Sequence, residues 1–281
     1  FAGAKTAQGN TDGNGIGDFY YAPPSGYLAL CSANLPEPSI GPNSDTQADD
    51  HFNTVLHTAN GSAGSFTGVG FLPDWIWAKS RNNGYAHELW DSNRGVNSTL
   101  QSNSNGAEIT DANRLVSFDS DGFSYGTLSN LYPNGATSVA WNWKANGGTT
   151  SSNTDGSITS TVQANTTAGF SIVKYTGNAT AGATVGHGLG AVPKWYFVKS
   201  RSLATGWVNY HQFQDSTPED GYLALNASDA FFDTITWNDT APTSSVFSLG
   251  PSGYSSNNAS ATYIAYCFAE IEGYSKFGSY T

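Results

Sequence analysis

Charged residues are scarce in this sequence. Only 12% of the 281 residues are charged, which is about half the usual share and too few for helices with ion-paired surfaces. Acidic residues outnumber basic ones by 22 to 11, and the net charge is −11. Binding to nucleic acid or to anionic membranes needs clustered Lys and Arg, and the chain has no basic run. The composition therefore argues against nucleic acid and membrane lipids as partners.

Cysteines and long apolar runs are scarce too. The two cysteines, Cys31 and Cys267, lie in short apolar runs, which predicts two buried free thiols rather than a disulfide. The sequence has no CxxC motif and no Cys/His cluster, as a zinc site would require. No run of about 18 apolar residues exists, so we expect no membrane insertion.

Aromatic and small polar residues take the place of charge. Aromatics make up 14% of the chain and Gly contributes 32 residues. Aromatic and β-branched residues fit half-buried strands, and Gly- and Asn-rich stretches recur every ten or so residues, as between the strands of a sandwich or barrel. No segment sustains a period of 3.6 residues. These patterns predict an all-β fold with little helix.

An internal repeat divides the chain. Three blocks recur in the same order: 52–61 with 170–179, 70–81 with 190–201, and 138–145 with 263–270. We therefore predict two tandem β-sandwich repeats, joined by a Gly/Ser/Thr-rich connection. The predicted segments are the end of an upstream domain with its linker at 35–38 (1–44), the first repeat (45–147), a connecting strand (148–165) and the second repeat (166–281).

The two ends suggest a piece of a longer polypeptide. The chain begins with Phe1, contains no Met and has no signal peptide. Lys276–Thr281 is similar to the strand opening at Tyr175 and Thr176, which suggests the start of a further repeat.

The repeated motifs carry a family resemblance. FLPDWIWAKSR, HELWDSNRG, FDSDGFSYG and VAWNWKANGG, with GHGLGAVPKWYFVKSR in the second half, resemble repeat domains of tail and fibre-like proteins of bacteriophages, marine phages especially. The stretch TAQGNTDGNGIGDFYYAPPSGYLALCSANLP resembles the end of an SPRY-type domain. The resemblance implies a virion structural protein with concanavalin-like or jelly-roll β-sandwiches. It brings no catalytic motif to transfer.

Two carboxylates and the histidines are the candidate catalytic groups. Glu88 and Asp91 could serve as the paired carboxylates of a glycosidase, but residues three apart on a strand point to opposite faces. We expect Asp91 and Arg94 to form a structural ion pair or turn cap instead. The five histidines accompany no GxSxG motif, and His87 and His211 occupy comparable places in the two repeats. We therefore predict that the protein is not an enzyme.

One loop could bind calcium. Asp12, Asn14 and Asp18 carry oxygen ligands at alternating positions, as a calcium loop does, but the EF-hand spacing and its terminal Glu are missing. A turn without metal is the favoured interpretation, and we expect no other cofactor.

Tryptophans supply the candidates for glycan contact, because sugar rings stack on aromatic faces. The alternating pairs Trp75/Trp77 and Trp141/Trp143 predict core positions, with both members of a pair on one face. Trp90, Trp207 and Trp237 flank Gly- or Asn-rich loops and are the predicted ligand-contact residues.

Three functions follow as hypotheses. The first is a bacteriophage tail fibre or other surface fibre at the virion surface, which contacts further copies of itself as a homotrimer, other virion proteins and a host glycan. The second is an extracellular bacterial carbohydrate-binding module or adhesin. The third is a glycan-degrading enzyme, which needs two carboxylates across a cleft.

Overall fold

The computed structural model describes residues 6–35, 38–41, 44–253 and 255–280. The chain forms two compact units, Phe1–Pro38 and Ser39–Thr281. The predicted linker at 35–38 includes Pro36 and Glu37, which lie outside the described residues. Within the described part, helix is limited to four 3₁₀ turns of three residues: η1 (Ser32–Asn34), η2 (Ala48–Asp50), η3 (Pro218–Asp220) and η4 (Ile235–Trp237).

In the first unit, one carboxylate stabilises the Gly/Asn-rich turn. Asn10 and Phe19 form an antiparallel bridge around the Gly/Asn-rich turn. The Asp12 carboxylate accepts hydrogen bonds from the backbone N–H groups of Asn14, Ile16 and Ala29. Short polar side chains that accept local N–H bonds in this way stabilise turns.

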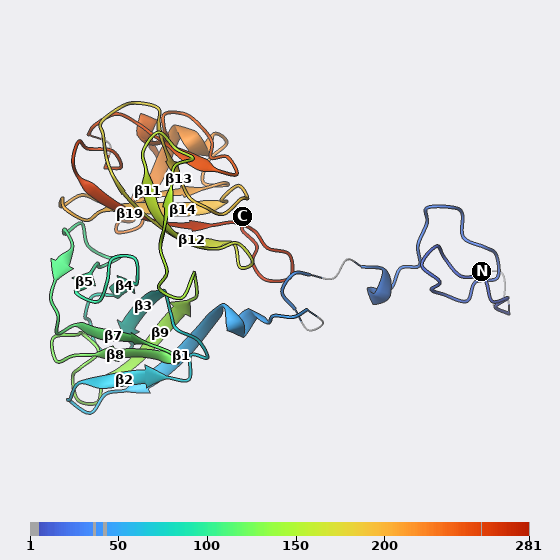
Figure 1. Cartoon of the computed structure of the whole chain (residues 1–281), viewed down its shortest axis with the longest axis horizontal. Helices are drawn as coiled ribbons and strands as arrows, with labels where there is room; N and C mark the ends of the chain where they lie inside the picture. The colour runs from blue at the N-terminus through green and yellow to red at the C-terminus, as the bar shows by residue number, and fades with distance from the viewer. Residues whose placement is uncertain (1–5, 36–37, 42–43, 254, 281) are drawn as a thin grey trace. The chain divides into compact units, whose positions relative to one another are not determined.

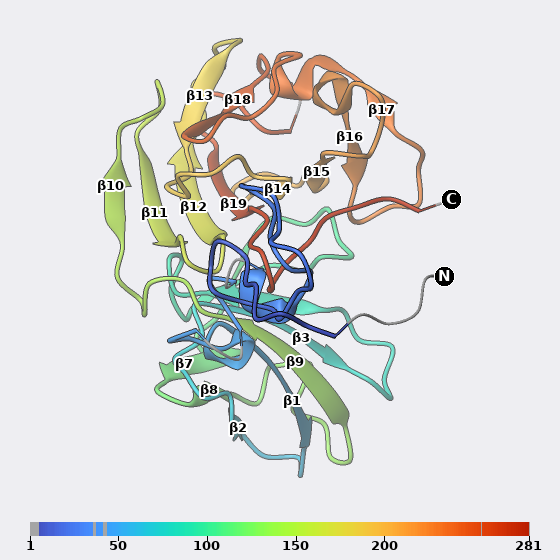
Figure 2. The same ribbon diagram turned by 90° about the vertical axis from the view of Figure 1, so that its right-hand side faces the viewer.

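The second unit contains both repeats (Figures 1 and 2). In the described residues, antiparallel strands form five sheets with the orders β1-β9-β3-β4, β2-β8-β7, β5-β6, β10-β11-β12-β19-β14-β15-β16-β17 and β13-β18. The strands of the first repeat are β1 (Phe52–Thr58), β2 (Gly64–Thr67), β3 (Trp75–Ser80), β4 (Glu88–Asp91), β5 (Ser98–Thr99), β6 (Ile109–Thr110), β7 (Leu115–Asp119), β8 (Gly122–Tyr125) and β9 (Thr137–Trp143). Those that follow are β10 (Ser151–Asn153), β11 (Ser160–Asn165), β12 (Phe170–Thr176), β13 (Ala183–Gly186), β14 (Trp195–Ser200), β15 (Val208–His211), β16 (Gly221–Ala224), β17 (Phe232–Asp233), β18 (Val246–Leu249) and β19 (Thr262–Phe268).

The sequence repeat is also a structural repeat. The order β1-β9-β3-β4 in the first repeat has its counterpart in β12-β19-β14-β15 of the second, and the pair β2-β8 corresponds to β13-β18. The second repeat extends its large sheet with β10 and β11 at one edge and β16 and β17 at the other. The predicted all-β fold built from sandwich-like repeats with little helix is confirmed.

Each repeat has its own core between a large and a small sheet. In the first repeat, Ile76 and Ala78 from β3 pack with Phe66, Trp90 and Phe123. In the second, the matching Tyr196 and Val198 pack with side chains such as Val185, Trp237 and Phe247. The alternation of side chains along β3 and β14 therefore leaves Trp75, Trp77, Trp195 and Phe197 on the other face of each sheet.

These second faces meet and form a third core. Trp75 lies between the sheets, with its ring centroid 4.5 Å from that of Tyr266, 5.7 Å from Phe170 and 5.9 Å from Phe197. The large sheets of the two repeats thus stack face to face through aromatic rings, and each small sheet lies outside its large one (Figures 1 and 2). The aromatic-rich motifs of the sequence build this shared layer.

Two turns show how single residues set the local structure. Ser120 and Asp121 form the two-residue turn that joins β7 to β8, and a Cβ on Gly122, the first residue of β8, would lie 2.0 Å from the Phe66 carbonyl oxygen. The buried carboxylate of Asp74 accepts the N–H groups of Ala145, Gly147 and Gly148, at 2.6–2.8 Å. The Gly-rich connection between the repeats is therefore held at its start.

Candidate functional site

The two stacked sheet faces are covered unequally. The segment between β4 and β7 lies against the face of the second repeat: Asn93 donates to the Thr161 and Ile172 carbonyls, and Arg94 to the Tyr266 hydroxyl. The corresponding segment of the second repeat instead forms β16, β17 and η4 beside its own sheet. Among the described residues of this unit, part of the first repeat's sheet face therefore has no covering segment.

The burial of corresponding residues in the two repeats shows how unequally the two sheet faces are covered. In the second repeat, Phe197, Ile264 and Tyr266 are fully buried. Their counterparts in the first repeat, Trp77, Val139 and Trp141, are all partly exposed. Leu56, on the same face at the sheet edge, is 66% exposed.

Three tryptophans form an open aromatic surface on this face. Trp77 and Trp141 are direct partners across β3 and β9, and Trp143 follows two residues later on the same face. We call Trp77, Trp141 and Trp143 the aromatic surface. They line a hollow of about 320 Å³. Because Trp143 also pairs with Trp75 across β9 and β3, the surface continues into the buried layer.

A polar hollow adjoins the aromatic surface at Trp77. This hollow of about 510 Å³ is lined by Trp77, His87, Ser102, Asn103, Leu225, Asn226, Ala227 and Ser228. The hollow is lined on one side by residues near β4 and β5 of the first repeat, and on the other by the loop after β16 of the second. An apolar wall with a few convergent polar groups is the usual composition of a ligand site.

A hydrogen bond fixes the indole of Trp77. Its Nε1 donates to Nδ1 of His87 over 2.7 Å, and the His87 backbone N–H donates to the side-chain oxygen of Asn103. Burial lowers the pKa of His87, and the positive charge of Lys79 lowers it further. The ring is therefore neutral near pH 7, with its proton on Nε2, because Nδ1 must accept the indole N–H.

The tryptophans predicted to contact glycan are not at the surface. Trp90, Trp207 and Trp237 are each fully buried, one in each of the three cores. Trp90 Nε1 donates to the Thr99 hydroxyl, and Trp207 Nε1 to the Gln101 carbonyl. This prediction was wrong, since a Gly- or Asn-rich loop beside a Trp does not show whether the loop exposes the ring or packs it inward.

The aromatic surface was missed for the opposite reason. The alternating pattern correctly placed Trp75 with Trp77, and Trp141 with Trp143, on one face. It did not indicate how far the facing sheet would extend over that face. The one signal in the sequence was the length of the matching segment of the second repeat. In the described residues this segment lies beside its own sheet, and part of the first repeat's sheet face stays uncovered.

The candidate catalytic groups have structural partners. The carboxylate of Glu88 is buried on one side of β4 with Arg114 and Ser129, at 2.6 Å from each. Asp91 lies on the other side, where it pairs with Arg94 at 2.5 Å and accepts its backbone N–H. The predicted opposite orientation and the predicted ion pair and turn cap are confirmed.

The calcium candidates are not brought together as a ligand set. Both Asp12 oxygens accept N–H groups, and these bonds, the one from Ala29 foremost, lower the pKa of Asp12 to about 2. Asn14 donates to the Asn34 side chain, and Asp18 accepts the N–H of Gly9. Within the described residues, no group of three or more His, Cys, Asp or Glu is placed to hold a metal ion.

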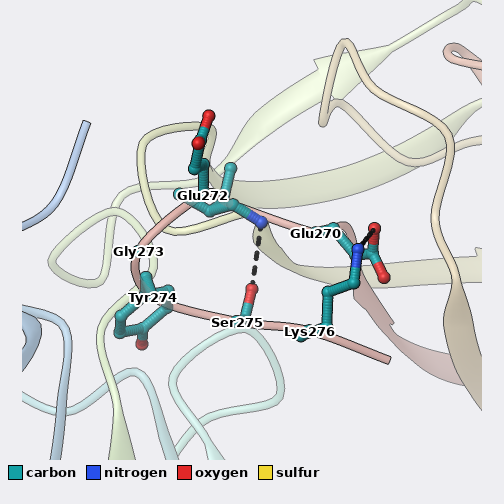
Figure 3. A pocket seen from close by; sticks show the side chains of 7 residues that line it. Glu270, Glu272, Gly273, Tyr274, Ser275 and Lys276 are labelled. Carbon is teal, nitrogen blue, oxygen red and sulfur yellow. Dashed lines mark hydrogen bonds and ion pairs between the residues drawn. The ribbon is translucent and has the colours of Figure 1, made fainter. Parts of the chain in front are cut away.

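Another hollow, of about 640 Å³, is lined by residues 270–276 and contains two glutamates. In Figure 3 the carboxylates of Glu270 and Glu272 point in different directions from the loop. The Phe277 N–H bond, together with Lys276, keeps the pKa of Glu270 below its ordinary value. A glycosidase acid needs a raised pKa, so Glu270 does not fit that role.

The structure also bears on the predictions of free, buried cysteines and of no membrane-spanning segment. Cys31 and Cys267 are both free, as predicted, but only Cys267 is fully buried, and Cys31 is partly exposed. Burial raises the pKa of the Cys267 thiol well above its ordinary value. In the part of the chain that the structure describes, no helix is long and apolar enough to cross a membrane.

The fold and the open aromatic face define a two-repeat, all-β protein with stacked sandwich sheets. Residues 47–281 match the profile of a protein family described as "Domain of unknown function (DUF7483)", and the chain belongs to that family. The match spans both predicted repeats. No curated protein and no solved structure matches the chain.

Proposed function

We propose that this protein is a non-catalytic surface module that recognises glycans through its aromatic surface. The observation that carries the proposal is the partial exposure of Trp77, Trp141 and Trp143 on the sheet face of the first repeat. Their counterparts in the second repeat, Phe197, Tyr266 and Phe268, are buried. Sheet-borne indoles offer flat apolar faces for sugar rings, and the rigid sheet spares the ordering cost that a loop would incur.

The polar hollow supports the same ligand class. Asn103, Asn226 and Ser228 lie beside Trp77, where amides and a hydroxyl can hydrogen-bond the hydroxyl groups of a neighbouring sugar. Stacking on the aromatic surface and hydrogen bonding in the polar hollow together suit an oligosaccharide that spans both.

The resemblance to tail and fibre-like repeats supports a place at the surface of a bacteriophage virion, as a fibre component beside other copies and other virion proteins. A bacterial adhesin or carbohydrate-binding module is the second candidate, which the same aromatic surface would serve. Electron microscopy separates them: symmetric copies on a phage appendage support the fibre, and a cell-surface location without particles supports the adhesin.

The test of glycan recognition compares two aromatic truncations of the full chain on a glycan array. Trp141→Ala removes one stacking face, and we expect at least about a tenfold loss of affinity, equivalent to about 1.4 kcal/mol. Phe213→Ala is the matched control, because Phe213 is 52% exposed and lines neither hollow. Equal binding by the wild type and Trp141→Ala, or no glycan bound by the wild type, would overturn the proposal.

A further inference from the structure

A further hollow lies on the large sheet of the second repeat and is lined by cations and hydroxyl groups. Its volume is about 240 Å³, and its lining residues are Thr159, Thr161, Lys174, Tyr175, Thr176, Arg201 and Thr262. Thr161 is the register partner of Lys174, and Thr176 that of Thr262, so β11, β12 and β19 set the spacing. We call this the cationic hollow. No carboxylate is among its lining residues.

Positive charge exceeds negative charge around this hollow. Arg94 and Arg201 share Glu108, at 3.0 and 2.8 Å, and Arg94 also pairs with Asp91. Lys174 lies within electrostatic range of all four of these groups, and Lys199 lies within range of Glu108. This group therefore contains four cations and two carboxylates, in a chain with 11 basic and 22 acidic residues, and two of the cations, Lys174 and Arg201, line the hollow.

The two lysines of this group are held by backbone carbonyls instead of carboxylates. Lys174 Nζ donates to the Asn93 carbonyl over 2.9 Å, and Lys199 Nζ to the Ser200 carbonyl over 2.8 Å. Burial lowers the pKa of both, and Arg201 lowers that of Lys174 further. An uncompensated cation attracts an anion most strongly where water is partly excluded.

We propose that the cationic hollow binds an oxyanion, namely a sulfate, phosphate or carboxylate group, through Lys174 and Arg201, with threonine hydroxyls donating from the rim. Arg201 presents a guanidinium that already engages Glu108 through Nε and Nη2, which leaves Nη1 for a ligand. Thr161, Thr176 and Thr262 supply hydroxyl donors around it. This site is separate from the aromatic surface, and the proposal does not depend on glycan recognition there.

The experiment is calorimetric titration of the full chain with sodium sulfate at fixed ionic strength, with chloride as the reference anion. Lys174→Met removes the charge but keeps the apolar stem, and we expect at least a tenfold loss of sulfate affinity. Lys276→Met is the matched control, since the Lys276 side chain is 86% exposed and lies outside this hollow. Sulfate binding that is absent, or equal in the wild type and Lys174→Met, would overturn the proposal.

A second variant keeps the test valid if Lys174→Met folds poorly. Thr176→Val removes a rim hydroxyl at an exposed position with little change of volume, and we expect a several-fold loss of sulfate affinity. Unchanged affinity in this variant would overturn the role of the rim hydroxyls.

Titration with a sulfated and a uronate oligosaccharide distinguishes the two sources of the oxyanion, an anionic glycan and a free inorganic anion. Lys174-dependent binding tighter than sulfate alone indicates an anionic glycan, and binding of the inorganic anion only indicates a free oxyanion.

Discussion

At the scale of single residues, His87 fixes the orientation of the Trp77 indole, which lines both the aromatic surface and the polar hollow. Its Nδ1 accepts the Nε1 hydrogen of Trp77 at 2.7 Å, and this requires a neutral ring. Protonation places a hydrogen on Nδ1 and breaks the bond. The orientation of Trp77 is therefore linked to pH.

This link predicts that glycan affinity falls with decreasing pH. Because burial lowers the pKa of His87, the loss should appear below the ordinary value of 6.5. In His87→Asn the amide oxygen replaces the Nδ1 acceptor without titrating, so affinity should stay nearly constant from pH 7.5 to 5. Titration calorimetry at several pH values measures this. A wild type whose affinity does not change with pH, or a variant that retains the full pH dependence, would contradict the role of His87.

At the scale of elements, the segment between β4 and β7 joins the repeats through buried charge. The side chains of Arg94 and Asp91 are fully buried, and Glu108 connects them to Arg201 of the second repeat. Removing one partner of a buried pair leaves an uncompensated charge, which is far more costly than losing a surface pair.

We therefore expect Arg94→Met to lower the free energy of unfolding by about 3–5 kcal/mol. Lys276→Met breaks an ion pair in which the lysine is 86% exposed, and should change it by no more than about 1 kcal/mol. Chemical denaturation of both variants provides the comparison. Similar values for the two would show that the buried network does not stabilise the joined repeats.

Elements also show what the sequence could and could not predict. Block matches placed β3 and β14 correctly, and alternation placed Trp75 and Trp77 on one face, because both signals are local. Exposure of Trp77, by contrast, depends on which distant segment lies over it. Trp207 shows the same limit, since its indole donates to Gln101, 106 residues away in the chain.

At the scale of the whole molecule, the aromatic layer makes the two repeats interdependent. Trp75 of the first repeat contacts Phe170, Tyr266 and Phe268 of the second, and separating the sheets would expose all of these rings to water. Residues 39–281 form one compact unit accordingly.

We expect the repeats to unfold together. Scanning calorimetry of the full chain should show one main transition, whose calorimetric and van't Hoff enthalpies agree. The physical reason is that, in the described residues of this unit, the large sheets of the two repeats bury aromatic side chains against each other. Two separate transitions of similar size would show that the layer couples the repeats only weakly.

Stability should also depend on pH through the histidines. Burial lowers the pKa of His51, His57, His87, His187 and His211, the five in the chain. The unfolded chain then takes up protons near 6.5 before the folded chain does, so stability falls as pH drops below about 6.5 towards the lowered folded values. Glu88, whose pKa burial raises, acts in the opposite sense.

Thermal unfolding between pH 7.5 and 5 tests this, with His187→Gln as the comparison. His187 is fully buried, so replacing it with a group that does not titrate should reduce the slope of unfolding temperature against pH. A slope that is the same in the variant, or a wild type that becomes more stable at lower pH, would contradict the assignment.

The most direct test of glycan recognition is NMR observation of the indole N–H signals of the eight tryptophans during titration with a glycan selected on the array. Stacking on the aromatic surface predicts that the signals of Trp77, Trp141 and Trp143 shift with a common dissociation constant. Those of Trp90, Trp207 and Trp237 should stay in place. Shifts confined to the buried tryptophans, or none at saturating glycan, would contradict glycan recognition at this surface.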